Sequence, residues 1–122
     1  MVSEKKIYEI SAVIHAAISA HATHGDPALS PVWYEKTGDI YKKTLSSTVE
    51  FCLSRDNVTG EDIHDLWVTG QLEKGWQWGV ELDSKKKRDP FLVPYRQLPA
   101  GVRMRYELTA DIVRIFKDCY KL

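Results

Sequence analysis

Aromatic and basic residues gather in one stretch of this chain, between positions 67 and 105. Three of the four tryptophans fall within twelve positions, and a run of four cations follows them. Indole rings can stack on nucleobases, and lysine and arginine neutralise phosphates. Such a set could hold a nucleotide. Its members are Trp67, Trp76, Trp78, Lys85, Lys86, Lys87, Arg88, Tyr95, Arg96, Arg103 and Arg105.

A purely structural role competes for part of this set. Trp67 shares a helical stripe with Ile63 and Gly70, which indicates a core position. One of Trp76 and Trp78 is expected to point inward and the other outward. In this alternative the basic run is a solvated loop.

The sequence gives little support for metal binding or catalysis. His15, His21 and His24 lie close in sequence, but a zinc or iron site needs three or four convergent ligands, and Asp26 is the nearby carboxylate. His64 lies near the start of a predicted helix. Adjacent side chains on a helix point in different directions, so His64 does not form an acid–base pair with the acidic residue beside it. The sequence contains no nucleophile elbow and no glycine-rich phosphate loop. We therefore expect no catalytic residue, no metal and no cofactor.

The composition indicates one small globular protein. The chain has 122 residues, of which 43% are hydrophobic and 28% charged, and its net charge is zero. Neither a membrane span of roughly 20 apolar residues nor a secretory pattern is visible, so we expect a cytoplasmic protein without membrane contact. Cys52 and Cys119 are predicted on apolar helix faces, with no disulfide or metal role.

Charge is distributed unevenly along the chain. Residues 49–83 carry eight acidic and two basic side chains, whereas residues 84–105 carry seven basic and one acidic. The basic stretch either presents a local anion site or neutralises the acidic stretch. Zero net charge places nucleic acid last among the partners considered.

Hydrophobic spacing predicts a mainly α fold, a small helical domain of four to five helices with a short β-hairpin-like element around residues 76–95. The first helix covers the apolar stripe of residues 7–21, with Ser3 as its cap. It ends near the Gly-Asp-Pro breaker at residues 25–27.

A second helix is predicted to begin at Ser30 and Pro31, since serine caps helices and proline suits their first position. It runs to about Leu53, with a bend at residues 38–39, and places Trp33 and Tyr41 on its apolar side.

Two further helical stretches follow. Thr59 opens a helix through a capping box, with Ile63 and Leu66 facing inward and the end at Gly75. Pro99 starts the last stretch, and Thr109 is predicted to cap a final helix.

Taken in order, the motifs of residues 63–99 resemble those of the RyR domain, the repeat found in pairs in ryanodine receptors and singly in bacterial and phage proteins. The matching elements are His-x-x-Trp, Gly-Trp-x-aromatic-Gly, a basic loop, and Pro-x-Leu-Val-Pro-Tyr. Trp78 stands where the family has tyrosine, and Asp89 where it has histidine. The resemblance covers roughly residues 58–120.

The resemblance implies a division and a function. Residues 1–57 would be an N-terminal helical extension and residues 58–122 the RyR-type repeat, one compact unit. Family members are not enzymes, and a nucleotide can stack on the tryptophan that corresponds to Trp76. The ligand-binding residues implied here are Trp76, Trp78, Asp83, Lys85, Lys87, Arg88, Tyr95 and Arg103.

We expect a nucleotide sensor or a protein that sequesters a nucleotide-derived signal, for example a phage counter-defence protein acting in the bacterial host cell. The competing hypothesis is a protein-interaction module, because exposed tryptophan and arginine are enriched at interface hot spots. A homodimer formed through the apolar N-terminal helix also remains open.

Overall fold

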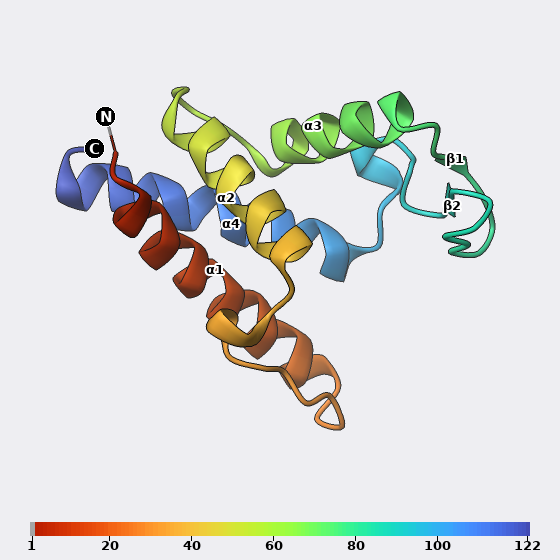
Figure 1. The fold of residues 1–122 in the computed structure, drawn as a ribbon, viewed down its shortest axis with the longest axis horizontal. Helices are drawn as coiled ribbons and strands as arrows, with labels where there is room; N and C mark the ends of the chain where they lie inside the picture. The colour runs from red at the N-terminus through yellow and green to blue at the C-terminus, as the bar shows by residue number, and fades with distance from the viewer. Residues whose placement is uncertain (1) are drawn as a thin grey trace. The chain divides into compact units, whose positions relative to one another are not determined.

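The computed structural model describes residues 2–122 and consists mainly of helices (Figure 1). The mainly α class with a short β element is confirmed. Position 1 of the predicted extension lies outside the described residues. In chain order the elements are α1 (Glu4–Gly25), η1 (Tyr34–Lys36), α2 (Asp39–Leu53), α3 (Gly60–Glu73), β1 (Gln77–Trp78), β2 (Arg88–Asp89), η2 (Tyr95–Gln97) and α4 (Ala100–Tyr120), where η denotes a 3₁₀ turn.

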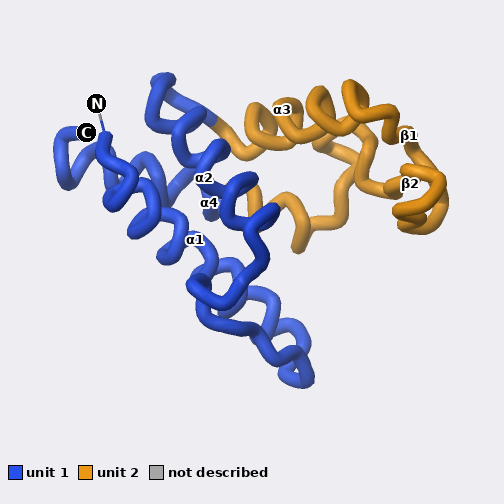
Figure 2. Tube along the Cα trace, viewed as in Figure 1, with its two compact units in different colours: residues 1–58, 108–122 blue, residues 59–107 orange. Residues whose placement is uncertain are grey.

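The chain forms two compact units (Figure 2). Unit 1 comprises residues 1–58 and 108–122, and unit 2 comprises residues 59–107. The sequence predicts a different division, between residues 57 and 58, into an N-terminal extension and a repeat. The compact units do not test that division, so it stays a prediction.

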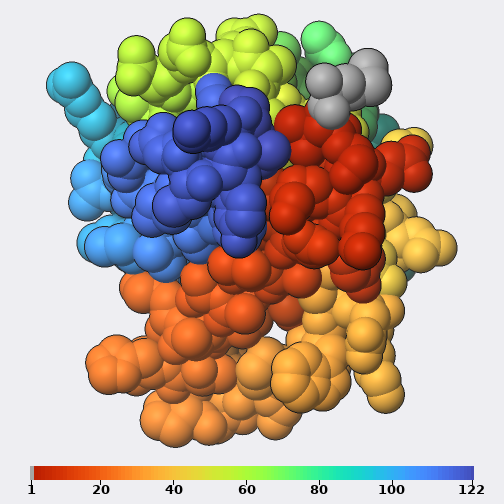
Figure 3. Space-filling model, turned by 90° about the vertical axis from the view of Figure 1, so that its left-hand side faces the viewer, coloured from red at the N-terminus to blue at the C-terminus, as the bar shows by residue number. Residues whose placement is uncertain are grey.

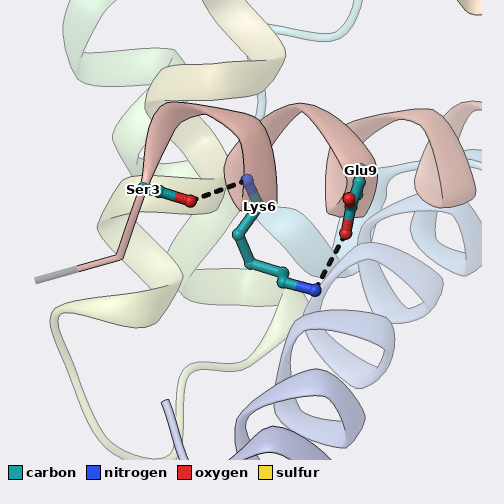
Figure 4. A network of polar contacts seen from close by, with 3 residues as sticks. All are labelled: Ser3, Lys6 and Glu9. Atoms are coloured by element: carbon teal, nitrogen blue, oxygen red, sulfur yellow. Dashed lines mark hydrogen bonds and ion pairs between the residues drawn. The ribbon is translucent and has the colours of Figure 1, made fainter.

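Helix α1 begins where its cap predicts. The Ser3 hydroxyl accepts a hydrogen bond from the Lys6 amide at 3.1 Å, and Lys6 Nζ lies 2.8 Å from Glu9 Oε2 (Figure 4). The predicted apolar stripe faces the core of unit 1, with Ile10 and Ile14 completely buried. In Figures 1 and 3 the start of α1 (red) lies beside the end of α4 (dark blue).

The second helix begins later than predicted. Residues 31–33 are not helical, η1 makes one turn, and α2 starts at Asp39. The reason is tertiary: Tyr34 is only 5% exposed and its ring centroid lies 5.0 Å from that of Tyr8. The Thr37 hydroxyl then donates to the Tyr34 carbonyl at 2.7 Å and closes the turn before a helix can propagate.

Two side chains predicted on the apolar face of that helix are not in the core. Trp33 is 77% exposed, and Tyr41 is 40% exposed. The Tyr41 hydroxyl instead lies 2.8 Å from His15 Nδ1. The aliphatic core of unit 1 consists of Ile7, Ile10, Ile14, Leu45, Val49 and Val113.

Helix α3 confirms the predicted capping box. Thr59 Oγ1 accepts from the Asp62 amide at 3.2 Å, and the Thr59 amide donates to Asp62 Oδ2 at 2.9 Å. Ile63 is buried as expected, but Leu66 is 41% exposed, so its inward placement is wrong. After Lys74 the chain turns through Gly75, whose φ of +88° is the left-handed conformation that favours glycine.

The predicted β element is present, but its strands pair in parallel rather than as an antiparallel hairpin. Gln77 pairs with Arg88 and Trp78 with Asp89. The chain reverses within the loop itself, where Asp83 and Arg88 form an antiparallel bridge. Arg88 therefore pairs with Gln77 on one side and with Asp83 on the other, which a two-strand hairpin would not require.

Helix α4 runs without interruption from Ala100 to Tyr120, so Thr109 is not a cap. It lies in the helix interior and is buried, because its neighbours Ala110 and Val113 face the core of unit 1. Cys52 is buried as expected, whereas Cys119 is exposed and its predicted apolar position is wrong.

Candidate ligand-binding surface

Trp76 and Trp78 differ in exposure as expected, but strand alternation is not the reason, because residues two positions apart share one face of a strand and Trp76 precedes β1. Trp76 is half-buried, and its amide donates to the Gln71 carbonyl at 3.0 Å, which ties the strand to the end of α3. Trp78 is 55% exposed within β1. Trp78 therefore offers more of its indole surface to a ligand than Trp76 does.

The basic loop after β1 has a backbone fixed by hydrogen bonds. Asp83 Oδ1 accepts from the amides of Lys85 and Lys86, both at 3.1 Å. The amide of Asp83 donates to the Arg88 carbonyl, and the Arg88 amide to the Asp83 carbonyl, each at 2.9 Å. The carboxylate of Asp83 is thus directed into the turn that it shapes.

Lys87 and Arg88 fold back on the protein. Lys87 has a φ of +56°, uncommon for a residue with a side chain, and its Nζ donates to the Lys74 carbonyl at 2.8 Å. The Arg88 guanidinium donates to the Lys86 carbonyl at 2.9 Å. A Cβ at Gly79 would lie 2.6 Å from Arg88 Cβ, so glycine permits this close packing. Lys85, Lys86 and Lys87 are all exposed, but of the three only the Lys87 side chain has a hydrogen bond among those described.

Tyr95 belongs to an aromatic cluster within unit 2. Its hydroxyl donates to Glu107 Oε1 at 2.7 Å and lies 3.2 Å from the Arg103 carbonyl oxygen. Burial, followed by the hydrogen bond to Glu107, raises the Tyr95 pKa well above its ordinary value. The charge of the half-buried Arg103 side chain lowers this pKa, but by less than burial and Glu107 raise it.

His64 lies at the centre of this cluster. From the sequence it is considered only for an acid–base pair, and its central position is not predicted. It is completely buried, and its Nε2 donates to the Val93 carbonyl at 2.7 Å. Its ring stacks on Trp67 and meets Tyr106 edge-on, with centroids 5.7 and 5.1 Å away. Its Nδ1 has no hydrogen-bond partner among the residues described. The His-x-x-Trp spacing was the available signal.

A model of the RyR domain family matches residues 34–117 of the 122 residues. The chain belongs to the RyR domain family. The matched stretch of this RyR domain begins in η1 and includes α2, α3, the β element, η2 and most of α4.

The eight implied ligand residues of the RyR domain all lie in unit 2, in two groups. Hydrogen bonds of the β element and its loop link the first group. In the second, Tyr95 and Arg103, the Tyr95 hydroxyl lies 3.2 Å from the Arg103 carbonyl oxygen. Burial, followed by the charge of Asp89 in β2, raises the pKa of Tyr106 to about 12. The first group consists of Trp76, Trp78, Asp83, Lys85, Lys87 and Arg88.

Two hollows of about 260 and 300 Å³ lie elsewhere, and both are lined by residues of unit 1. Within residues 2–122, no cluster of three or more His, Cys, Asp or Glu side chains is arranged to hold a metal ion. Over the same range, no helix is long and apolar enough to cross a bilayer.

Proposed function

We propose that this RyR domain binds a nucleotide-derived small molecule on the surface formed by Trp78, Lys85 and Lys86. The observation that carries the proposal is an indole 55% exposed beside a basic loop whose backbone is fixed by Asp83. A base would stack on the Trp78 ring, a contact worth roughly 1–3 kcal/mol. The two exposed lysines would meet its phosphates.

The fixed loop supports this assignment on energetic grounds. A flexible loop would lose conformational entropy when it closed on a ligand, and that loss would weaken binding. Here the Asp83 turn and the contacts of Lys87 and Arg88 already hold the backbone. We therefore assign Asp83, Lys87 and Arg88 to shaping the loop. Trp76 would contribute its exposed edge.

We further propose that the domain binds without catalysing a reaction. The buried His64 donates to a backbone carbonyl and is enclosed by aromatic rings, so a substrate would not reach it as a general base. A domain that binds without turnover would act as a sensor or sequester its ligand. A counter-defence role in a phage remains an expectation from the family resemblance.

The test is calorimetric titration with adenine and guanine nucleotides, cyclic di- and trinucleotides, and ADP-ribose. We expect a nucleotide to bind, with Trp78→Ala weakening it roughly tenfold or more, as lost stacking predicts. The double variant Lys85→Ala/Lys86→Ala should also lower the nucleotide affinity. This loss should be larger at low salt than at high salt, because salt screens exposed charges. Trp33→Ala in unit 1 is the matched control and should leave the affinity unchanged.

Absence of binding across the panel would overturn the proposal, as would an affinity that is the same for Trp78→Ala and the unaltered chain. If only Tyr95→Phe or Arg103→Ala weakens binding, the ligand sits on the second group of residues rather than beside Trp78.

One further observation favours a protein partner as a second candidate. Val80 is 79% exposed and Leu82 66% exposed, immediately after Trp78. A nucleotide would not need these aliphatic side chains, whereas interfaces bury such residues. The double variant Val80→Ser/Leu82→Ser distinguishes the candidates, since it should leave nucleotide affinity unchanged and abolish binding of a protein partner.

A further inference from the structure

An apolar hollow of about 300 Å³ opens on unit 1, between the second half of α1 and the segment that leads to α2 (orange in the lower part of Figure 3). Its lining is mainly hydrocarbon. The residues around it are His15, Ile18, Ser19, Ala22, Thr23, Leu29, Ser30, Pro31, Thr37 and Tyr41.

His15 fixes the shape of this hollow. Its Nε2 lies 2.7 Å from the Val32 carbonyl, to which it must donate. Its Nδ1 then accepts from the Tyr41 hydroxyl at 2.8 Å. One imidazole thus ties α1 to the segment at residue 32 and to the first turn of α2. The hollow is therefore formed before anything occupies it.

The same segment exposes large apolar side chains to water. Trp33 is 77% exposed and Ile40 85% exposed, and neighbouring residues add to them. Together these residues present on the order of 600 Å², near the roughly 800 Å² that each partner contributes to a standard interface. The set comprises Leu29, Val32, Trp33, Ile40 and Tyr41.

We propose that this face, residues 29–41 with the hollow beside them, docks a second copy of the chain, with Trp33 of each copy in the hollow of the other. A two-fold interface uses the same patch twice, so that patch must contain both a projection and its receptacle. Trp33 directly follows Pro31 and Val32 at the edge of the hollow, which supplies both parts.

The charges around the face agree with pairing of identical copies. A two-fold dimer brings each charge near charges of the same patch, so a patch of one sign would repel its copy. Here both signs occur, so opposite charges can meet across the axis. The charged residues of the face and of the two positions after it are Glu35, Lys36, Asp39, Lys42 and Lys43.

The apolar stripe of α1 is not available for such an interface. Ile7, Ile10 and Ile14 are buried within unit 1 itself. Removal of residues 1–28 would therefore remove part of the core, and truncation cannot test dimer formation. Point variants of exposed residues can.

The experiment is sedimentation velocity of the full chain from low micromolar to millimolar concentration. We expect a concentration-dependent species of twice the 14.0 kDa monomer mass. Trp33→Ala should raise the dimer dissociation constant at least tenfold. Ala22→Phe, which fills the hollow from within its own chain, should do the same. Leu72→Ala, an exposed apolar residue of α3 outside the face, is the control and should change nothing.

A chain that stays monomeric over the whole range overturns the proposal. A dimer whose dissociation constant is the same in Trp33→Ala, Ala22→Phe and the control also overturns it, because another surface must then form the interface. Thermal unfolding of each variant checks that its fold is retained. If Ala22→Phe unfolds, Ile40→Ser takes its place, because Ile40, like Trp33, is exposed and its replacement should not disturb the core.

Discussion

Units 1 and 2 are stabilised in different ways. Unit 1 buries aliphatic side chains from three helices, and Ile10, Ile14 and Val49 lose all contact with solvent. Unit 2 buries few aliphatic residues and instead surrounds the His64 imidazole with aromatic rings. Its loops are held by side chains that bond to the backbone, as with His64 and Val93 or Lys87 and Lys74.

This difference shows how unit 2 can expose a tryptophan and lysines on a defined loop. Hydrocarbon packing fixes helices, but a loop of polar residues needs hydrogen bonds to keep one conformation. Asp83 provides two of them to the basic loop. Rigid loops that carry exposed functional side chains are typical of binding regions. We therefore expect unit 2 to be more sensitive to the loss of polar contacts than unit 1.

The largest effect should come from His64. His64→Ala removes a fully buried ring from the aromatic cluster and leaves the Val93 carbonyl without its donor. The loss of packing and of one buried hydrogen bond predicts destabilisation of about 2–4 kcal/mol. Urea unfolding monitored by circular dichroism measures it.

His64→Gln is the matched control, since its amide nitrogen can still donate to the carbonyl, and it should recover part of the stability. If both variants were as stable as the original chain, His64 would not be the centre of unit 2 and the comparison of the two units would fail.

Gly60 should give the next largest effect. A Cβ at this position would lie 2.7 Å from the Tyr95 hydroxyl and 3.0 Å from the Glu107 amide nitrogen. Gly60→Ala should therefore cost about 1–3 kcal/mol through overpacking. The control is Gly70→Ala in the same helix, where nothing lies within 4 Å, and which should stabilise by up to about 1 kcal/mol through helix propensity. Equal effects of the two substitutions would show that the Tyr95–Glu107 contact is not tightly packed.

The smallest effect, from Tyr106, is a pH dependence of stability that appears only above about pH 10. Burial, followed by the charge of Asp89, raises the pKa of Tyr106 from 10.0 to about 12 in the folded protein. The folded state thus holds this proton more tightly than the unfolded state, so the stability that it contributes is complete below pH 10 and is lost as the pH rises through about 12. Unfolding free energies measured between these values should fall less steeply in Tyr106→Phe. An unchanged slope would place Tyr106 in contact with water.

Local signals in the sequence were sufficient for several elements. The caps at Ser3 and Thr59 depend on residues three positions apart, and both are formed. The aliphatic stripe of α1 likewise repeats at helical spacing and is buried.

Other features depend on contacts distant in sequence, which no local pattern encodes. The start of α2 is delayed because Tyr34 packs on Tyr8, 26 positions earlier (34 − 8). Lys87 resembles the lysines beside it in the sequence, yet its position opposite the end of α3 directs its side chain to Lys74. Thr109 resembles a cap, but α4 continues through it because its neighbours are buried.

The most direct test of the proposed nucleotide site is a proton–nitrogen NMR titration of the unaltered chain with ATP, GTP and ADP-ribose in turn. The four tryptophans give four separate indole N–H signals. With at least one nucleotide, we predict a saturable shift of the Trp78 indole and of the Lys85 and Lys86 amides, while the Trp33 and Trp67 indoles stay in place. Saturable shifts that leave Trp78 unmoved, or no shift with any of the three, would contradict the account.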